Sequence, residues 1–584
     1  MKGEILSKTE GMLGASLGNE SCEFRVWAPN AGRVKLQLLN AQGKHELAME
    51  RCDDGHFVLQ VPAKAGDRYL YIVDENKAVP DPVSRLLPEG VHGPTEIVAP
   101  QNFLWSDADW RGLALKEYII YELHVGTFTP QGTFDGVIEK LPYLKKLGVS
   151  VIEIMPVAAF PGTRNWGYDG VSLYAVQSSY GGPQGLKRLV DAAHRMGLAV
   201  ILDVVYNHLG NEGNYLRLFA PYFTHKHRTP WGDAINYDQE GCGGVRSYVV
   251  ENACYWVREY HLDGLRLDAV QTIQDDSPRH ILAEIKEAVA AQARESRRPV
   301  CVIAETDEND EKMVRPQSSG GYGLDAIWSD DFHHAIHAFL TGERKGYYQD
   351  FGRPQQIART LNQGFIFQGE PFQFWGGRAR GTSPRQMPLP AHVICIQNHD
   401  QVGNRAQGER LTVLIPYGAR MVATAMLLLA PHTPLLFMGQ EYDERNPFQF
   451  FTDYSDPTLQ KAVSEGRRNE FKDFDFKHVP DPQSPETFTR SKLSWTFAEG
   501  ENFMLDWHTA LLSLRKKYVT NTERTCRAEL EEGILTMYIP AQQSRLKLVA
   551  RIEGKAELPQ PGQGWEKMLD ADADGCAISI YAQM

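Results

Sequence analysis

The chain of 584 residues is long enough for several domains around a large core, and its 42% hydrophobic and 23% charged residues are ordinary for a soluble globular protein. Its net charge of −13 and the lack of a basic block argue against nucleic acid and against anionic substrates in general. No apolar run has the length of a membrane span, the N-terminus lacks the apolar segment of a signal peptide, and the eight cysteines form no CxxC pair, so we expect a cytoplasmic protein without membrane association.

Residues 1 to about 100 have the pattern of an all-β domain. Cys22–Trp27, Val34–Leu38 and Tyr69–Val73 alternate apolar and polar side chains, with turn residues between the first two. Short strands at this spacing predict a β-sandwich. Aromatic side chains such as Trp27 and Tyr69 could bind glycan, but we favour a place in the sandwich core. Prolines between 80 and 94 indicate an irregular linker.

From about residue 110 to 518, short apolar strands alternate with amphipathic helical stretches. Helical periodicity is clearest over 134–147, 185–196, 245–260 and 279–293. The eight strands that we expect are Ile119–His124, Ser150–Met155, Ala199–Val205, Gly264–Asp268, Cys301–Glu305, Asp325–Trp328, Val393–Gln397 and Pro434–Met438. Strand–helix alternation repeated eight times predicts an α/β fold, a catalytic (β/α)8 TIM barrel, rather than an open sheet.

Two connections in this region are too long to be simple loops: about 207–244 after the third strand and 330–391 after the sixth. Long connections in compact domains are usually functional. The second is rich in aromatic residues, which could line a glycan cleft or form a local core. Strand patterns return at 533–539, 546–552 and 577–581, which predicts a small C-terminal β domain over 519–584.

Polar side chains stand where the predicted barrel strands end. Arg266 and Asp268 close the fourth strand and point the same way, because side chains alternate along a strand. The cation favours the ionised carboxylate that a nucleophile requires, although such a pair can equally be structural. The ends of three more strands hold Asp203 to His208, Glu305, and His399 with Asp400. All these ends meet at one mouth of a TIM barrel, so together they predict an active site.

The residue types at this mouth suit glycoside hydrolysis, in which two carboxyl groups flank the bond that is cut. A barrel with Asp, Glu and His could instead hold a divalent metal for hydrolysis or enolisation. Arg266 beside Asp268 would compete with such a cation. The lack of a basic cluster disfavours phosphorylated substrates.

Four segments resemble the four short sequence regions of the α-amylase superfamily. They are DVVYNH at 203–208, GLRLDAV at 264–270, AE at 304–305 and NHD at 398–400, on the third, fourth, fifth and seventh predicted strands. The segment from Phe24 to Ala31 resembles the sandwich of α-glucan branching and debranching enzymes. The resemblance implies a retaining mechanism in which Asp268 is the nucleophile, Glu305 the general acid/base and Asp400 a group that binds sugar hydroxyls. It also implies that Arg266 orients Asp268, that His208 and His399 bind the sugar in the −1 subsite, and that Asp203 braces the site.

Within this superfamily, longer segments are similar to the malto-oligosyltrehalose trehalohydrolases. They are 165–171, 174–177 with 180–183, 328–334, 398–405 and 450–453. These enzymes cut the α-1,4 bond next to the terminal trehalose of maltooligosyl trehalose and release trehalose. The resemblance implies substrate contacts by Tyr168, Asp169, Gln401 and Arg405, and +1 and +2 subsites for trehalose at Asp331, Phe332, His333 and His334. Helix capping by Asp330 or Asp331 is the alternative for that cluster. A functionally coupled maltooligosyl trehalose synthase is implied by resemblance alone.

The sequence departs from the pattern in two places. Thr306 stands where we associate a serine with these enzymes, and Tyr168 with Asp169 replaces the Tyr-His pair of many amylases. Asn207 matches a residue that helps to hold calcium in many amylases, but no carboxylate cluster supports it, so we predict no required metal and no other cofactor.

Two competing functions stay open. One is a related branching or debranching enzyme, which the leading sandwich fits equally. The other is an inactive barrel that binds glycan, whose mark would be a lost nucleophile or acid. Asp268, Glu305 and Asp400 are all present, which argues against the inactive barrel.

Overall fold

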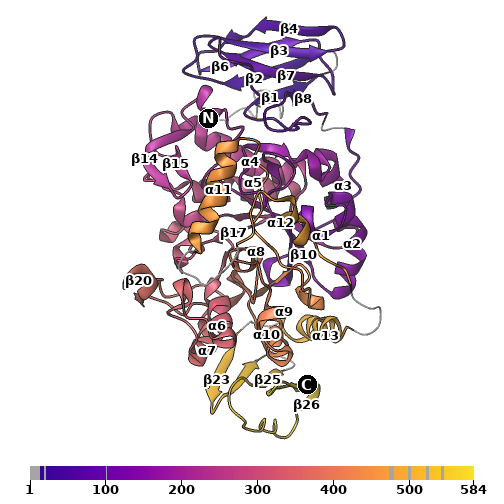
Figure 1. The fold of residues 1–584 in the computed structure, drawn as a ribbon, viewed down its shortest axis with the longest axis vertical. Helices are drawn as coiled ribbons and strands as arrows, with labels where there is room; N and C mark the ends of the chain where they lie inside the picture. The colour runs from indigo at the N-terminus through magenta and orange to yellow at the C-terminus, as the bar shows by residue number, and fades with distance from the viewer. Residues whose placement is uncertain are drawn as a thin grey trace.

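The computed structural model describes residues 13–18, 21–99, 102–471, 479–496, 502–520, 525–540 and 545–583. The N-terminal segment judged to lack a signal peptide lies mostly outside these residues. Three parts follow one another along the long axis of the molecule: an N-terminal sandwich, a barrel and a C-terminal sheet (Figure 1). Among the described residues, no helix has both the length and the apolarity to cross a membrane.

The N-terminal part is a sandwich of two antiparallel sheets. One sheet has the order β1-β2-β6-β5 and the other β4-β3-β7-β8. Phe24, Leu36 and Tyr71 fill the space between the sheets and are fully buried. Tyr69 packs on Phe24 in this core, as we favoured, whereas Trp27 is buried on the opposite face of β2, outside the space between the sheets. The strands are β1 (Gly14–Leu17), β2 (Cys22–Trp27), β3 (Val34–Asn40), β4 (Gly43–Ala48), β5 (Glu50–Arg51), β6 (His56–Val61), β7 (Arg68–Val73) and β8 (Thr95–Glu96).

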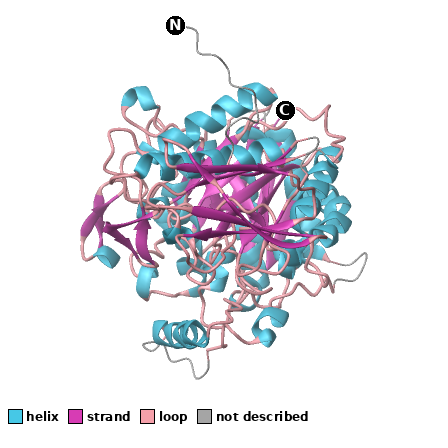
Figure 2. Ribbon diagram, turned by 90° about the horizontal axis from the view of Figure 1, so that it is seen from above, coloured by secondary structure: helices cyan, strands magenta, loops and turns pink. Residues whose placement is uncertain are grey.

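The middle part is a closed barrel of eight parallel strands, which confirms the predicted (β/α)8 fold. Seen from above, helices lie around the central strands (Figure 2). Each strand is buried along its whole length, because helices cover the outside and side chains fill the inside. All eight predicted strands are present, with ends shifted by at most a few residues. In barrel order they are β9 (Ile120–Leu123), β10 (Val151–Ile154), β13 (Ala199–Val204), β16 (Gly264–Leu267), β17 (Cys301–Glu305), β18 (Ala326–Trp328), β21 (His392–Cys395) and β22 (Thr433–Phe437).

The helices between the strands follow local signals. Helix α2 (Phe134–Leu147) begins after Thr133, whose hydroxyl accepts from the Gly136 N–H, and ends at Gly148, where φ is 108°. The apolar run at 421–429 lies in α10 (Tyr417–Leu429), which is buried on nearly all sides. The remaining covering helices include α3 (Gly182–Arg195), α4 (Cys242–Glu259), α5 (Ile281–Ser296), α6 (Asp330–Thr341), α7 (Pro354–Gln363) and α13 (Phe503–Tyr518).

The long connections form small structures at the barrel mouth. The one after β13 contains a hairpin of β14 (Phe223–Thr229) and β15 (Gly232–Ile235), and the one after β18 holds α6, α7 and a hairpin of β19 (Glu370–Phe372) and β20 (Arg378–Arg380). After β21 come α8 (His399–Gly403) and α9 (Leu411–Leu414), and after β22 come α11 (Pro457–Glu470) and α12 (Pro485–Arg490). Four residues form α1 (Val125–Phe128), and β11 (Ala158–Ala159) pairs with β12 (Ser172–Val176).

The sandwich packs on the connection after β13. The Trp27 ring meets the Tyr222 ring edge to face, with centroids 5.6 Å apart. A Cβ at Gly244 would lie 2.3 Å from the Trp27 ring, so only glycine permits this approach. The C-terminal sheet, in the order β23-β24-β25-β27-β26, packs on α7 and α10. Its strands are β23 (Arg527–Glu531), β24 (Ile534–Ile539), β25 (Arg545–Arg551), β26 (Glu566–Ala573) and β27 (Cys576–Gln583).

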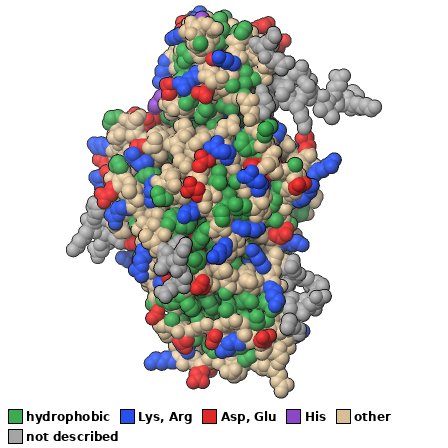
Figure 3. All heavy atoms as spheres, turned by 90° about the vertical axis from the view of Figure 1, so that its right-hand side faces the viewer, with side chains coloured by type: hydrophobic (Ala, Val, Ile, Leu, Met, Phe, Trp, Pro, Cys, Tyr) green, Lys and Arg blue, Asp and Glu red, His purple; other side chains and the backbone are tan. Residues whose placement is uncertain are grey.

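Charged side chains of both signs are interspersed on the face shown in Figure 3. A surface that binds nucleic acid would instead carry a continuous basic stripe or patch. The mixed pattern agrees with the net charge of −13.

Candidate active site

Arg266 stands at the centre of the barrel mouth and is fully buried. Its Nη1 donates to Asp203 Oδ2 at 2.8 Å and to Asp268 Oδ1 at 2.7 Å, and its Nη2 lies 3.7 Å from Glu305 Oε2. The guanidinium lies over the Trp328 ring, 4.2 Å from the centroid. One cation therefore gathers the carboxyl groups of three successive barrel strands.

Asp268 is fixed from two sides. While Arg266 holds Oδ1, the Asn207 Nδ2 donates to Asp268 Oδ2 at 2.8 Å and to its carbonyl oxygen at 2.7 Å. The Asn207 side-chain oxygen pairs with His208 Nδ1, so both ends of this amide are engaged within the site. Asn207 therefore orients Asp268, and its side-chain oxygen faces His208 where an amylase would offer it to calcium.

Glu305 lies in a different environment from Asp268. Burial raises the pKa of Glu305 well above its usual value and the neighbouring Asp268 and Asp400 charges add to this, while Arg266 opposes the shift. The Ala269 N–H donates to Glu305 Oε2 at 2.6 Å. Ala269 adopts a left-handed conformation, with φ of 41°, which is strained for a residue with a side chain. The strained turn after Asp268 thus aims a backbone donor at the second carboxyl group.

A chain of hydrogen bonds links His399 to Asp203. The Tyr168 hydroxyl donates to Asp203 Oδ2 at 2.6 Å and lies 2.7 Å from His399 Nε2. Glu122 of β9 accepts from the His399 N–H at 3.0 Å and pairs with its Nδ1. Burial would lower the pKa of His399, but the charges of Glu122 and Asp400 outweigh it and raise that pKa to about 9. Burial raises the pKa of Asp203 to about 7, against the pull of Arg266.

Asp400 is the open member of the group, because 41% of its side chain is exposed at the mouth. Its Oδ1 accepts from Asn404 Nδ2 at 3.1 Å and lies 3.6 Å from His399 Nε2. Gln401, also on α8, is half-buried beside it. Asp330, the first residue of α6, faces the same region: burial raises its pKa to about 7, and Asp400 and Asp307 contribute to the shift.

Aromatic side chains stand beside these polar groups. Trp231, at the tip of the β14–β15 hairpin, stacks on His208 with ring centroids 4.4 Å apart and is 46% exposed. The connection after β18 adds Phe374, which is exposed to the same extent. Exposed rings of this kind are the surfaces on which sugar rings stack.

Asp331, Phe332 and His333 are buried, and their contacts with trehalose stay a prediction. Asp331 accepts from Arg380 Nη1 at 2.9 Å, from Asn309 Nδ2 at 2.7 Å and from the Ile366 N–H at 2.6 Å. These residues hold the β19–β20 connection in place.

The other predicted contacts differ in how open they are. His333 bonds the Ile396 carbonyl and the Tyr348 hydroxyl, and His334 is packed among aromatic rings of 347–351. Both Nη atoms of Arg405 donate to Glu343 at 2.9 Å, so this guanidinium is held by a protein partner. Asp169 accepts from Asn165 and from the Tyr454 hydroxyl, which ties the loops after β10 and β22 together.

Sequence reasoning missed Glu122, Asp330 and the role of Asn207. The sequence did contain a signal for Glu122. A single carboxylate within the apolar stretch of β9 is costly to bury unless it has a partner, and this predicts a role for it. The role of Asn207 depends on its position across from β16, which the sequence alone does not reveal.

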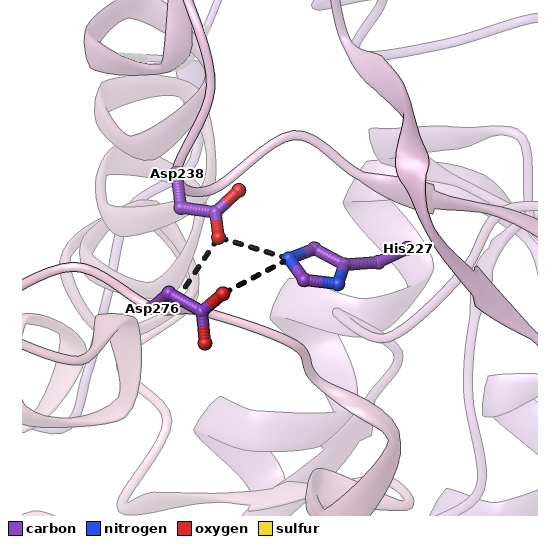
Figure 4. Close-up of side chains that lie close together, drawn as sticks. All are labelled: His227, Asp238 and Asp276. Atoms are coloured by element: carbon purple, nitrogen blue, oxygen red, sulfur yellow. Dashed lines mark hydrogen bonds and ion pairs between the residues drawn. The ribbon is translucent and has the colours of Figure 1, made fainter.

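One group of side chains on the hairpin has the composition of a metal site. His227 Nε2 lies 2.9 Å from Asp238 Oδ2 and 3.7 Å from Asp276 Oδ2 (Figure 4). The Lys226 ammonium lies 2.8 Å from the same Asp238 oxygen and 2.7 Å from the same Asp276 oxygen. The lysine thus places a cation between the two aspartates, and a metal ion would have to displace it.

Comparisons with known proteins agree with this geometry. Residues 12–96 match the family described as carbohydrate-binding module 48 (isoamylase N-terminal domain), and residues 97–229 match the α-amylase catalytic domain. A malto-oligosyltrehalose trehalohydrolase from Saccharolobus solfataricus is 49% identical over 87% of this chain and 87% of that protein. One from Mycobacterium tuberculosis is 43% identical over 84% of this chain and 86% of that protein. A crystal structure of a putative α-amylase from Salmonella typhimurium, 41% identical, superposes with a TM-score of 0.89 over 98% of this chain and 99% of that chain.

The similarity extends over most of both chains. On this evidence, the chain belongs to the malto-oligosyltrehalose trehalohydrolase family of α-amylase-type glycoside hydrolases.

Proposed function

We propose that this enzyme hydrolyses the α-1,4-glucosidic bond next to the terminal trehalose of maltooligosyl trehalose and releases trehalose with retention of configuration. The observation that carries the proposal is the contrast between two carboxyl groups on one guanidinium. Asp268 is paired with Arg266 at 2.7 Å, whereas Glu305 lies 3.7 Å from it and has a raised pKa. Carboxyl groups in such different environments suit the two roles of a retaining glycosidase.

In the first step, Asp268 attacks the anomeric carbon while Glu305 gives its proton to the leaving oxygen. Arg266 and Asn207 hold the two Asp268 oxygens, so the nucleophile meets the sugar in one orientation. Burial keeps Glu305 protonated before this step. The products are a covalent glycosyl–enzyme ester and free trehalose.

In the second step, the ionised Glu305 takes a proton from water as the water oxygen attacks the anomeric carbon and breaks its bond to Asp268. Asp268 leaves as a carboxylate, and two inversions give net retention. Asp400 accepts hydrogen bonds from sugar hydroxyls at the open mouth, and His399 and His208 complete the −1 subsite. Asp203 and Tyr168 brace Arg266 and His399 from behind.

Selection of the trehalose end is assigned to the connection after β18. Asp330 at the start of α6 is close enough to affect the charge state of Glu305, which supports a position near the leaving group. Asp331 and Arg380 fix the neighbouring backbone. We propose this connection, rather than the buried face of α6, as the wall of the +1 and +2 subsites.

The remaining parts take supporting roles in the proposal. We assign residues 1–100 to a sandwich of carbohydrate-binding type, 110–518 to the catalytic barrel and 519–584 to a C-terminal β domain. Resemblance alone suggests functional coupling to a synthase that makes the trehalose-ended substrate. All eight cysteines are free thiols, which fits a reduced cytoplasm.

Product analysis on two substrates tests the proposal. Maltopentaose and a trehalose-ended glucan of equal length are incubated with the enzyme, and the products are separated. We expect free trehalose from the second and little cleavage of the first. Equal cleavage of both substrates would show a general α-glucan hydrolase. New α-1,6 linkages would indicate branching. Turnover of neither substrate would refute the proposal.

A further inference from the structure

A carboxyl group without a protein partner lies inside the barrel, below the site. Glu153 of β10 is 1% exposed, and within the described part of the chain neither of its oxygens has a hydrogen-bond partner. The strand pairs Glu153 with Glu122 of β9 on one side and with Ile201 of β13 on the other. Val151, two residues earlier on the same face, packs in the apolar interior of the barrel. Glu153 therefore points inward, one layer closer to the mouth.

The residues above Glu153 carry open hydrogen-bonding positions of their own. Among the described residues, Asp203 Oδ1, Arg266 Nε and Nη2, and Trp328 Nε1 have no hydrogen-bond partner, although all are buried. Arg266 and Asp203 are close enough to Glu153 to influence its charge. Buried polar atoms in native proteins are nearly always hydrogen-bonded, either to protein or to ordered water. Donors of Arg266 and Trp328 and acceptors of Asp203 and Glu153 together form a complementary set around which water can be held.

We propose that Glu153 is a positioning residue: as a neutral carboxylic acid it holds bound water against Arg266 and Asp203, and so keeps the guanidinium directed at Asp268 and Glu305. The catalytic consequence rests on the proposed function, whereas the protonated state of Glu153 does not. A neutral acid supplies one O–H donor and one carbonyl acceptor. The acceptor suits the N–H groups of Arg266, and the donor suits Asp203 Oδ1.

The neutral form follows from the surroundings. Burial raises the pKa of Glu153 well above its usual value, and the charge of Glu122 beside it raises it further, against the opposing effect of Arg266. Arg266 already faces Asp203, Asp268 and Glu305. An ionised Glu153 would compete with these groups for the guanidinium and turn it away from the reacting sugar.

Two isosteric or near-isosteric variants separate the possible roles. Glu153→Gln keeps a neutral donor and acceptor, and Glu153→Leu removes both. We expect Glu153→Gln to retain kcat within about threefold of the wild type with an unchanged pH profile. We expect Glu153→Leu to lose about tenfold or more in kcat at nearly constant KM, with a shifted acid limb, because buried donors of a charged group are left unpaired. Val151→Ala, which removes packing from the same strand but no polar atom, is the control and should lower stability without moving the pH profile.

Infrared difference spectroscopy tests the charge state without reference to activity. The wild type titrated between pH 5 and 8 should keep a C=O stretch of a protonated carboxylic acid that is missing in Glu153→Gln, and this holds even if Glu153→Leu fails to fold. A wild type that releases no trehalose would overturn the proposed function and leave the infrared result standing. The positioning role is overturned if Glu153→Leu matches the wild type in kcat and pH profile. A Glu153→Gln variant as impaired as Glu153→Leu, or the lack of the C=O band, would overturn the role of Glu153 as a neutral acid.

Discussion

Glu122→Gln removes the charge that keeps His399 protonated, and its effect on stability should depend on pH. The pKa of His399 is raised from 6.5 to about 9 in the folded protein. A raised pKa means that the folded state binds the proton more tightly, so the stabilisation is complete below pH 6.5 and is lost as pH rises through 9. A difference of this size corresponds to about 3 kcal/mol of the free energy of unfolding. His399 is 1% exposed, so solvent screens this interaction little.

Urea denaturation of the wild type and of Glu122→Gln at pH 6 and at pH 10 measures this contribution. We expect the variant to be less stable than the wild type by about 3 kcal/mol more at pH 6 than at pH 10, because only the wild type carries the His399 charge at the lower pH. Titrating groups that the Glu122 charge does not reach are common to both proteins and cancel in the difference. Glu139→Gln on the exposed face of α2 is the matched control and should show no such dependence.

The same variant should lower kcat by about tenfold to a hundredfold, because the His399 imidazole loses a charge-assisted hydrogen bond that fixes it beside Tyr168 and Asp400. An equal destabilisation at pH 6 and pH 10 would refute the reasoning. It would mean that Glu122 acts on His399 through packing or geometry and leaves its protonation unchanged.

Three further predictions concern the mouth of the barrel and the hairpin. Glu305→Gln should lower kcat on glucans by about 10²- to 10⁴-fold. It should leave kcat on an α-maltosyl fluoride nearly unchanged, because the fluoride leaving group needs no proton. Equal losses on both substrates in steady-state kinetics would contradict the acid role of Glu305. Trp231→Ala should raise KM by about fivefold with a smaller change in kcat, since the loss of a stacking ring costs about 1 kcal/mol, and Trp231→Phe should restore most of the affinity; an unchanged KM in Trp231→Ala would place the ring outside the sugar path. Chelation by EDTA should leave activity and the melting temperature unchanged, because Lys226 already lies between Asp238 and Asp276; activity lost to EDTA and recovered with calcium would contradict this.

Most of the barrel was predictable because its strands are short, apolar and buried on both faces. Each strand therefore stands out in the sequence as a short apolar segment between two helical patterns. Parallel topology then brings the polar residues at the strand ends together. The sequence alone therefore predicted one site that contains Asp203, Arg266, Asp268 and Glu305.

The sugar contacts expected of Asp331 and Arg405 stay predictions, and both side chains have protein partners from distant parts of the chain that the sequence did not indicate. Asp331 looked like a sugar ligand, but Arg380, 49 residues later, returns on the β19–β20 hairpin and takes its carboxylate. Arg405 is likewise engaged by Glu343, 62 residues earlier. Local sequence does not report which of several polar residues in a loop will meet a partner from another loop and which will be left facing the substrate.

Lys226 has a consequence for how the hairpin that bears Trp231 responds to its surroundings. A calcium ion exchanges with the medium, and a loop that it holds loosens whenever the ion is scarce. The ammonium of Lys226 is covalently attached to β14 and cannot dissociate, so its link to Asp238 and Asp276 is present at any calcium concentration. Its strength instead depends on ionic strength through the pair with Asp276, because that carboxylate is 69% exposed and exposed charges are screened by salt. Trp231 is therefore expected to be more mobile at high salt, and the enzyme's affinity for long glucans should fall with added sodium chloride and not with chelator.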